Sequence, residues 1–434
     1  MTITKNIVER VLKKIGLVFD ETLGIWSHTE TRIPVTVWWN EEKEQLVLLD
    51  QTKLPFETSI WTTTDWRKAA WEGIKGMVVR GSQAIGAAAG YAVLLAAKAI
   101  LHAKPTEDFD EFLRACTEIR STRPTASPLM WTINRTVEAA TKALRDGKSA
   151  EDIIEVIKKA ADYFLAADLI LCQYLIKEGL QYIEEQDVIM THCNGGSLSS
   201  SYGGHALGMI EEAHAQGREI LVVAKETRPR SQGFKLTTWE LNRAGVPVVL
   251  VTDNMIGAAF KRFKVKKVIL GVDRLARDGS VANKIGSADL ARIAAHFDEI
   301  SFFYATSYST IDLNAVGKEI PIEERDKEEI LYPYRLEAKD KKERGILSRD
   351  ALDQWPPTHL IATSEIPETN KIGLFNPAFD ITPPGLIDLL LLDIGSYAPY
   401  QIRSLTDAKI TELVIERLRA SGINLNWFNE MVEE

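Results

Sequence analysis

The sequence predicts an α/β fold: a small N-terminal β element and a helical domain, followed by a Rossmann-like domain with a parallel sheet. From about residue 65 to 185, apolar residues recur at three- and four-residue spacing, which is typical of helices. After residue 185, short apolar, β-branched runs alternate with helical segments, which indicates βαβ units and a parallel sheet. We therefore predict one domain over residues 1–185 and a second, Rossmann-like domain over residues 186–434.

The N-terminal segments predict a helix, two strands and a buried helix. Residues 5–15 have helical spacing, and two apolar runs at 33–39 and 45–49 flank a charged Asn-Glu-Glu-Lys turn. Residues 84–101 are Ala-rich and apolar and run into charged residues. We expect this stretch to form a buried helix rather than a membrane span.

Composition and charge limit the classes of function. The 434 residues are 45% hydrophobic and 26% charged, which is typical of a globular protein. The net charge of −9 disfavours a nucleic acid partner. The three cysteines (Cys116, Cys172 and Cys193) are widely spaced and odd in number, which argues against a disulfide framework and a zinc site. We expect a reducing, cytoplasmic setting, no signal peptide, no metal and no membrane partner.

Polar residues follow five predicted strands, where ligands of open α/β sheets bind. The strands are VIMTHC, EILVVAKE, VPVVLVTD, KKVILGVD and EISFFYAT. The polar segments after them are residues 193–197, 226–233, 253–254, 273–287 and 306–312. Because these segments converge on one edge of the sheet, together they predict a site more strongly than any single motif does.

The glycine-rich turn CNGGSLSSSYGG follows the first of these strands. It contains neither GxGxxG nor GxxxxGK[ST], so it is either a tight connection or a cradle for a phosphate or sugar. Cys193 is either an inert small residue or a thiol activated at the N-terminus of the helix expected next. His192 and His205 flank the turn; each could be a general base, but a structural role is the commoner one.

Further candidates lie on both sides of the predicted boundary. Asp273 is either a helix cap or a buried acid with a raised pKa. Asn283 and Lys284 follow a turn that either folds over the same edge or is a solvated loop. Arg80 and Arg123 each precede a predicted helix, and two such arginines in an acidic protein favour binding of a charged small molecule.

A set of motifs then stands in a fixed order along the chain: RGSQAIG, STRPT, THCNGGSL, ETRPRSQG, VTDNM, GVDRLARDGSVANKIG, STID, IPIEERD and FNPAFDITPP. Over residues 45–390 this set resembles the methylthioribose-1-phosphate isomerase family. Its superfamily includes regulatory subunits of translation initiation factor 2B and ribose-1,5-bisphosphate isomerases. The resemblance implies a cofactor-independent aldose–ketose isomerase of methionine salvage, acting on a sugar phosphate as a homodimer.

The resemblance also assigns residues. The cysteine of THCN and the aspartate of GVDR are catalytic in the family, and they correspond to Cys193 and Asp273. The positions that correspond to substrate-binding residues are Arg80, Gly81, Ser82, Arg123, Gln232, Asn283 and Lys284. Regulatory members generally lack the Cys–Asp pair, so its presence favours an enzyme.

The chain departs from the family pattern in several places. It reads RGSQAIG where the family has RGAPAIG, and it carries an inserted segment near 333–360 and a long tail after about 396. These departures leave the C5 substituent of the sugar open. The alternatives are an isomerase of 5-deoxyribose 1-phosphate or ribose 1,5-bisphosphate, or a non-catalytic regulatory subunit like those of translation initiation factor 2B.

Overall fold

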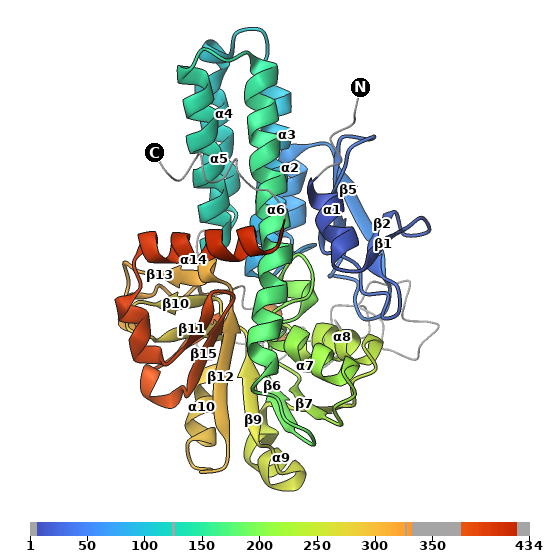
Figure 1. Cartoon of the computed structure of the whole chain (residues 1–434), viewed down its shortest axis with the longest axis vertical. Coiled ribbons are helices and arrows are strands. Elements are labelled where there is room, and N and C mark those ends of the chain that lie inside the picture. Colours follow the sequence, from blue (N-terminus) through green and yellow to red (C-terminus); the bar gives the residue numbers. More distant parts are fainter. Residues whose placement is uncertain (1–6, 124–125, 326–327, 332–374, 423–434) are drawn as a thin grey trace, which may run out of the picture.

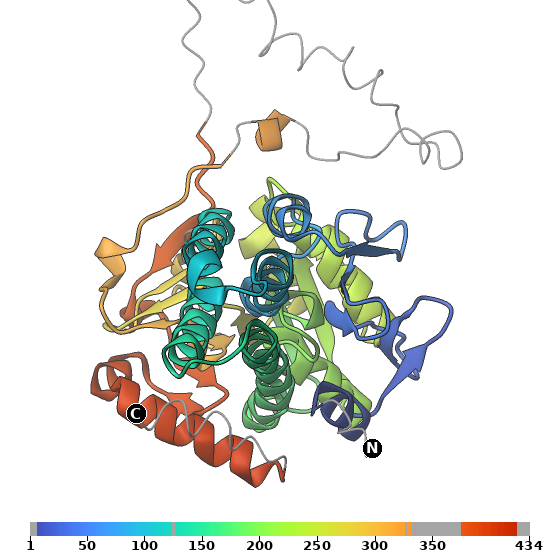
Figure 2. The same cartoon turned by 90° about the horizontal axis from the view of Figure 1, so that it is seen from above.

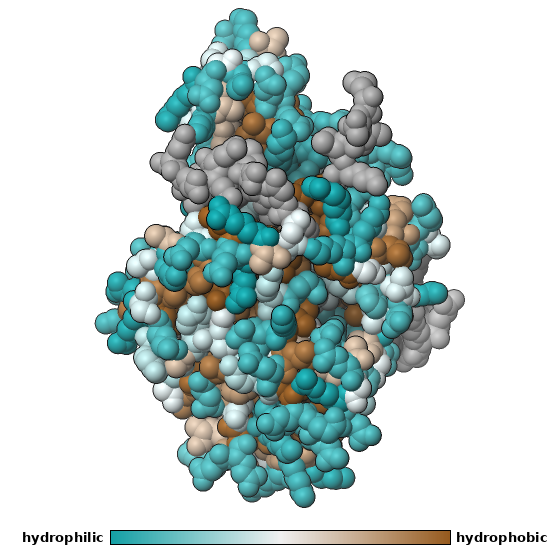
Figure 3. Space-filling model, viewed as in Figure 1, coloured by the Kyte–Doolittle hydropathy of each residue, from teal (hydrophilic) through white to brown (hydrophobic). Residues whose placement is uncertain are grey.

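The computed structural model describes residues 7–123, 126–325, 328–331 and 375–422. The insertion predicted near 333–360 lies outside the described residues. On the face drawn in Figure 3, hydrophilic side chains are interspersed with small hydrophobic patches.

A small β element forms the N-terminal part, as predicted. Helix α1 packs beside a two-stranded hairpin, and three antiparallel strands form a separate sheet. The predicted strand pair around the Asn-Glu-Glu-Lys turn is confirmed as β3 and β4, while β1, β2 and β5 are additional. The bounds are α1 Ile7–Lys14, β1 Leu17–Asp20, β2 Ile25–His28, β3 Val37–Asn40, β4 Gln45–Leu49 and β5 Ile60–Thr63.

Long helices make up the rest of the first half and stand above the sheet domain in Figure 1. Helix α3 has alanine or glycine at most of its buried positions, so α5 and α6 pack closely against it. By length and composition α3 could span a membrane, but 83% of its most apolar window is buried in the protein. The helices are α2 Trp66–Lys68, α3 Ser82–Ile100, α4 Pro105–Ser121, α5 Ser127–Arg145 and α6 Ala150–Leu180.

A seven-stranded sheet forms the core of the second half, in the order β16-β15-β12-β9-β6-β7-β8. All neighbouring strands are parallel except β15 and β16. The five predicted strands are confirmed, and β15 and β16 are additional. The bounds are β6 Val188–Thr191, β7 Leu221–Lys225, β8 Val248–Val251, β9 Lys267–Leu270, β12 Ser301–Thr306, β15 Leu389–Leu392 and β16 Gly395–Tyr397.

Helices connect these strands where the sequence predicted them. Helix α6 runs down from the bundle to the sheet, and α7 packs against it (Figure 1). The connecting helices are α7 Ala206–Ala215, α8 Thr238–Arg243, α9 Ile256–Phe263 and α10 Ser287–Ala294.

The structure also contains a second sheet, which the sequence reasoning missed. Its four strands run in the order β13-β10-β11-β14, and the antiparallel pair β11 and β14 aligns Lys284 with Phe379. Asn283 and Lys284 therefore lie on a strand and not in a loop. The bounds are β10 Arg274–Ala276, β11 Val281–Lys284, β13 Ile311–Asp312 and β14 Phe379–Thr382.

The described part of the C-terminal tail ends in helix α14, Asp407–Ala420, which begins after the capping side chain of Thr406. This helix packs against α6, and Arg417 lies 5.1 Å from the ring centroid of Tyr174. Figure 2 shows α14 at the border of the molecule, on the side away from the short helix α11, Glu328–Leu331. The boundary near residue 185 stays a prediction, because α6 and α14 join the two halves.

Candidate active site

A pocket of about 350 Å³ opens at the carboxyl ends of β6 and β9. Its wall combines the turn before α3, the glycine-rich turn after β6, the segment after β9 and strand β11. Six of the nine predicted site residues line it directly. The lining residues are Arg80, Gly81, Ser82, His192, Cys193, Asn194, Gly195, Ser199, His205, Gly271, Val272, Asp273 and Asn283.

Cys193 is held by its backbone. Its φ of 67° lies in the left-handed region, which costs a non-glycine residue free energy. The Cys193 N–H donates to the Thr227 hydroxyl at 2.8 Å, and the Thr237 hydroxyl donates to the Cys193 carbonyl at 2.6 Å. These bonds fix the cysteine while its sulfur stays on the pocket side, 3.8 Å from Arg80 Nη1.

Cys193 does not lie at the N-terminus of an α-helix, so that part of the prediction is wrong. The glycine-rich turn forms only a 3-10 turn at Ser197–Ser199, and α7 begins at Ala206. Gly203 and Gly204 both have positive φ, so the backbone is not helical just before α7. The positive partner of the thiol is therefore the Arg80 side chain rather than a helix dipole.

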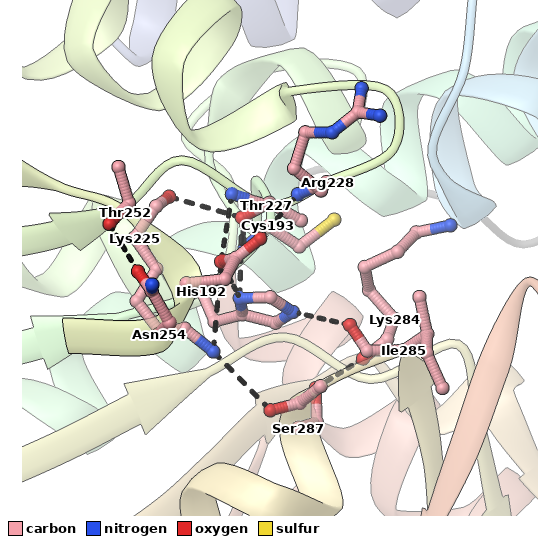
Figure 4. A network of polar contacts seen from close by, with 12 residues as sticks. His192, Cys193, Lys225, Thr227, Arg228, Thr252, Asn254, Lys284, Ile285 and Ser287 are labelled. Atoms are coloured by element: carbon pink, nitrogen blue, oxygen red, sulfur yellow. Dashed lines mark hydrogen bonds and ion pairs between the residues drawn. The ribbon is translucent and has the colours of Figure 1, made fainter. Parts of the chain in front are cut away.

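A buried polar layer supports this turn from below (Figure 4). His192 Nε2 lies 2.8 Å from the Ile285 carbonyl, so Nε2 carries the proton in this pair, and Nδ1 lies 3.3 Å from Thr227 Oγ1. Burial, with the nearby charge of Lys225, holds the pKa of His192 well below its usual range. His192 is therefore a neutral structural histidine.

His205, the second histidine beside the turn, also has a lowered pKa, about 4, because it is buried. It lines the pocket, and among the described residues its Nε2 has no hydrogen-bond partner. A neutral imidazole here can accept or donate one hydrogen bond but carries no charge at neutral pH.

The turn before α3 brings Arg80 to the cysteine. Arg80 Nη2 donates to Asn194 twice, to the carbonyl at 3.0 Å and to Oδ1 at 2.6 Å. Gly81 has a φ of 88°, and a Cβ there would lie 2.4 Å from the Cα of Ser199. Only glycine fits this close approach. Ser82 is the first residue of α3, which begins two residues earlier than the sequence predicted.

A buried acid that the sequence reasoning missed, Glu240 on α8, holds the glycine-rich turn. Its carboxylate accepts hydrogen bonds from the N–H groups of Ser197 and Leu198 and from Asn194 Nδ2, the last at 2.8 Å. Burial raises the pKa of Glu240 to about 7, although these hydrogen bonds oppose the shift. Because Asn194 also binds Arg80, Glu240 fixes two neighbours of Cys193.

Replacing Glu240 with alanine is expected to lower the free energy of unfolding by roughly 3 kcal/mol, since each unsatisfied buried donor costs about 1–3 kcal/mol. Glu240→Gln keeps one acceptor oxygen and should lose less. Urea unfolding of the two variants measures the difference. Equal midpoints for wild type and Glu240→Ala would show that the carboxylate does not hold the turn.

Asp273 faces the same pocket from the segment after β9. No helix follows it; β10 begins at Arg274, so the buried-acid interpretation holds over the helix cap. Burial raises the pKa of Asp273, and the charges of Lys284, Arg80 and Arg123 lower it in part. Asp273 therefore lies among four cations, the fourth being Arg325, and burial still drives it toward its protonated form.

Strand β11 supplies Asn283 and Lys284 side by side. Asn283 lines the pocket and donates from Nδ2 to Ser287 Oγ at 2.9 Å. Burial and the charge of Arg325 lower the pKa of Lys284 to about 8, while Cys193 and Asp273 oppose that shift. In Figure 4 the Lys284 side chain and the Cys193 sulfur extend toward the same side.

Besides Lys284, two predicted residues lie outside the pocket wall. Arg123 is buried, and burial with the charge of Arg325 lowers its pKa to about 10; Asp273 acts in the opposite direction. Arg123 is therefore close enough to Asp273 to interact. Gln232 is buried with an unpartnered Oε1, and no hydrogen bond in the described structure links it to Cys193 or Asp273, so its role stays a prediction.

Within the described ranges, no group of three or more His, Cys, Asp or Glu side chains is arranged to hold a metal ion. What the arrangement offers instead is a thiol, a carboxyl group driven toward protonation, and several cations around one pocket. Such a site can bind an anion and transfer protons next to it.

The model of the initiation factor 2 subunit family matches residues 78–399. The chain belongs to this family. Curated relatives named methylthioribose-1-phosphate isomerase include one from Pelotomaculum thermopropionicum, 38% identical over 87% of this chain and 96% of that protein. One from Thermosipho melanesiensis is 37% identical over 85% of this chain and 96% of that protein. These relatives confirm the family resemblance read from the motifs.

Solved structures of family members agree with the fold. The 5-methylthioribose 1-phosphate isomerase of Pyrococcus horikoshii OT3 aligns with a TM-score of 0.69 at 29% identity, covering 88% of this chain and 97% of that chain. A protein titled translation initiation factor eIF-2B, subunit delta, from A. fulgidus aligns with a TM-score of 0.65 at 32% identity, covering 88% and 99%. The predicted α/β architecture is thus confirmed.

Proposed function

We propose that this protein is an aldose–ketose isomerase that converts 5-methylthioribose 1-phosphate to 5-methylthioribulose 1-phosphate. The observation that carries the proposal is the meeting of Cys193 and Asp273 in one pocket beside Arg80. The curated relatives named for this isomerisation support it, because they cover most of this chain.

The chemistry begins with ring opening, because the phosphate on the anomeric oxygen prevents simple opening to a free aldehyde. Asp273, driven toward its protonated form in its partly buried position, donates a proton to the ring oxygen, and the bond from that oxygen to C1 breaks. The resulting cation at C1 is conjugated with the phosphate-bearing oxygen.

Hydrogen transfer from C2 to C1 completes the isomerisation. In one route the C2 hydrogen leaves as a proton and an enediol with the phosphate on its C1 oxygen forms. Protonation at C1 and loss of the C2 hydroxyl proton then give the ketone. In the other route the C2 hydrogen moves directly as a hydride, and the C2 hydroxyl loses its proton to become the ketone. Cys193, fixed above the reacting carbons, either moves the proton or stabilises the cation.

Basic side chains around the reacting groups hold the substrate. Arg80, Arg123 and Lys284 surround Asp273 closely enough to influence its pKa. Cationic donors bind phosphate oxygens more strongly than neutral ones, and they orient the sugar for proton transfer. Gln232, Asn283 and the turn at Gly81 and Ser82 complete the proposed binding site.

A ketose-forming assay tests the proposal with three compounds: 5-methylthioribose 1-phosphate, 5-deoxyribose 1-phosphate and ribose 1,5-bisphosphate. Turnover of the first above the other two is expected. Preference for either of the others would reassign the substrate and keep the reaction class. Turnover of none would contradict an isomerase.

The runner-up is a regulatory subunit that binds a sugar phosphate without converting it. The alignment with the A. fulgidus protein titled translation initiation factor eIF-2B, subunit delta, favours it. It predicts capture of an initiation factor in a pull-down and no turnover.

We also propose that the protein is a homodimer in the cytoplasm with no nucleic acid partner. Light scattering at several protein concentrations tests the dimer.

Lys284 gives the proposed isomerase a pH dependence. Its pKa of about 8 means that it is cationic below pH 8 and loses its charge above it. If the charged form binds the phosphate, KM should rise about tenfold per pH unit above 8. Lys284→Arg keeps the charge and should flatten this rise. A wild-type KM that is constant from about pH 7 to 9.5 would contradict the role of Lys284.

A further inference from the structure

Arg325 is a cation with a largely buried side chain, and it is not among the predicted site residues. Its side chain is 9% exposed, and its Nε has no hydrogen-bond partner in the described part of the chain. The nearest carboxylate oxygens belong to Glu323, 3.8 Å from Nε, and Glu329, 3.9 Å from Nη1. Both distances exceed that of a hydrogen bond.

Arg325 lies among the cations of the proposed site. Its charge is the largest electrostatic influence on Arg123 and on Lys284, ahead of Asp273 in both cases. Its Nη1 also lies 3.7 Å from Met77 Sδ, in the segment that leads to Arg80. Arg325 therefore lies beside the segment that leads to Arg80.

The chain around Arg325 is fixed to the rest of the site by polar contacts. Glu329 binds Arg230 at 2.7 Å, and the Ile330 carbonyl accepts from Arg228 Nη2 at 2.7 Å. The Arg325 N–H donates to the Asn376 carbonyl at 2.8 Å. Figure 2 shows the short helix α11, which carries Glu329, on the same side of the molecule as the segment leading to β14.

The neighbouring Arg123 also has a buried side chain with unpartnered hydrogen-bond donors. It is 8% exposed, and among the described residues its Nε and Nη1 have no hydrogen-bond partner. The ion pairs of Arg325 with Glu323 and Glu329 offset part of its charge, but they leave its Nε donor unpartnered. Because the two guanidinium groups also repel each other, an anion between them would stabilise both. A phosphate dianion satisfies both, because guanidinium groups match its oxygens in geometry and charge.

We propose that Arg325 binds the phosphate of the substrate together with Arg123 and Lys284. This inference rests on the proposed function for the identity of the ligand, while the anion site itself stands on the geometry. The phosphate does not react, so contacts to it act equally on ground state and transition state and appear in KM rather than kcat.

Inorganic phosphate is the probe that tests Arg325. In Arg325→Ala, we expect its inhibition constant and the substrate KM to rise together by about 10- to 100-fold, with kcat within about threefold of wild type. Arg325→Lys keeps the positive charge but lacks the forked guanidinium group, so its inhibition constant and KM should lie between those of wild type and Arg325→Ala. The matched control is Arg292→Ala, which removes an exposed arginine paired with Asp289 and should change neither constant.

Several results would overturn the proposal. One is an Arg325→Ala variant with an unchanged inhibition constant, and another is a loss of kcat alone. If the alanine variant does not fold, the inhibition constant, KM and kcat of Arg325→Lys serve as the test instead. Calorimetry with inorganic phosphate distinguishes this inference from the proposed function. Phosphate binding that depends on Arg325, without turnover of any sugar phosphate, would contradict the isomerase but support the anion site. Turnover of a sugar phosphate without binding of inorganic phosphate would support the isomerase but contradict the anion site.

Discussion

Replacing Asp273 with asparagine is expected to lower kcat by about 10²- to 10⁴-fold, the usual contribution of a general acid. The amide has nearly the same shape as the carboxyl group and can still donate a hydrogen bond, but it cannot transfer a proton to the ring oxygen. Because Asp273 is partly buried among Arg80 and Lys284, the variant also changes the local charge. KM should therefore change much less than kcat.

The pH profile distinguishes proton donation from a structural role. The pKa of Asp273 is raised, so the protonated, active form predominates at lower pH and is lost as the pH rises through that value. Wild-type kcat should fall on the alkaline side, and the residual activity of Asp273→Asn should lack this limb.

Asp289→Asn is the matched control for Asp273→Asn. Asp289 is an exposed aspartate on α10 that pairs with Arg292, so this variant should keep wild-type kcat and its pH profile. Near-normal turnover in Asp273→Asn would remove Asp273 from the mechanism.

The parallel sheet could be predicted because its inner strands are largely buried and therefore read as continuous apolar runs. The second sheet could not, because its strands are short and their partners are distant in sequence. Strand β11 pairs Asn283 with Asp380, and its neighbour β10 has only three residues. Neither strand shows a periodicity that separates it from a loop.

Some residues of the site could be predicted from the sequence, and others could not. Cys193 and Asp273 could be found because they follow strands whose carboxyl ends meet at one edge. Glu240 lies between Trp239 and Leu241 on a buried helix, and a charged residue in such a run was the one available signal for it. Arg325 stands in the IPIEERD motif, but the motif alone assigned it no role, because its place near the site depends on contacts between segments far apart in the chain.

Cys193→Ser is expected to reduce kcat by about 10²- to 10⁴-fold, within the range for a group that moves a proton in the transition state. The hydroxyl is close in size to the thiol, and the backbone at φ 67° is held by Thr227 and Thr237 in either variant. The fold should therefore survive, with an unchanged urea midpoint, so that the loss reports on the sulfur.

Alkylation by iodoacetamide tests the same sulfur independently. Burial raises the pKa of Cys116 to about 12 and that of Cys172 well above its usual range, so both are poor nucleophiles. Cys193, which is 8% exposed and lies beside Arg80, should be the site modified first, with parallel loss of activity and protection by substrate. Cys116→Ser and Cys172→Ser should keep wild-type turnover and the same inactivation rate. Modification of Cys193 without loss of activity would show that the thiol has no part in the reaction.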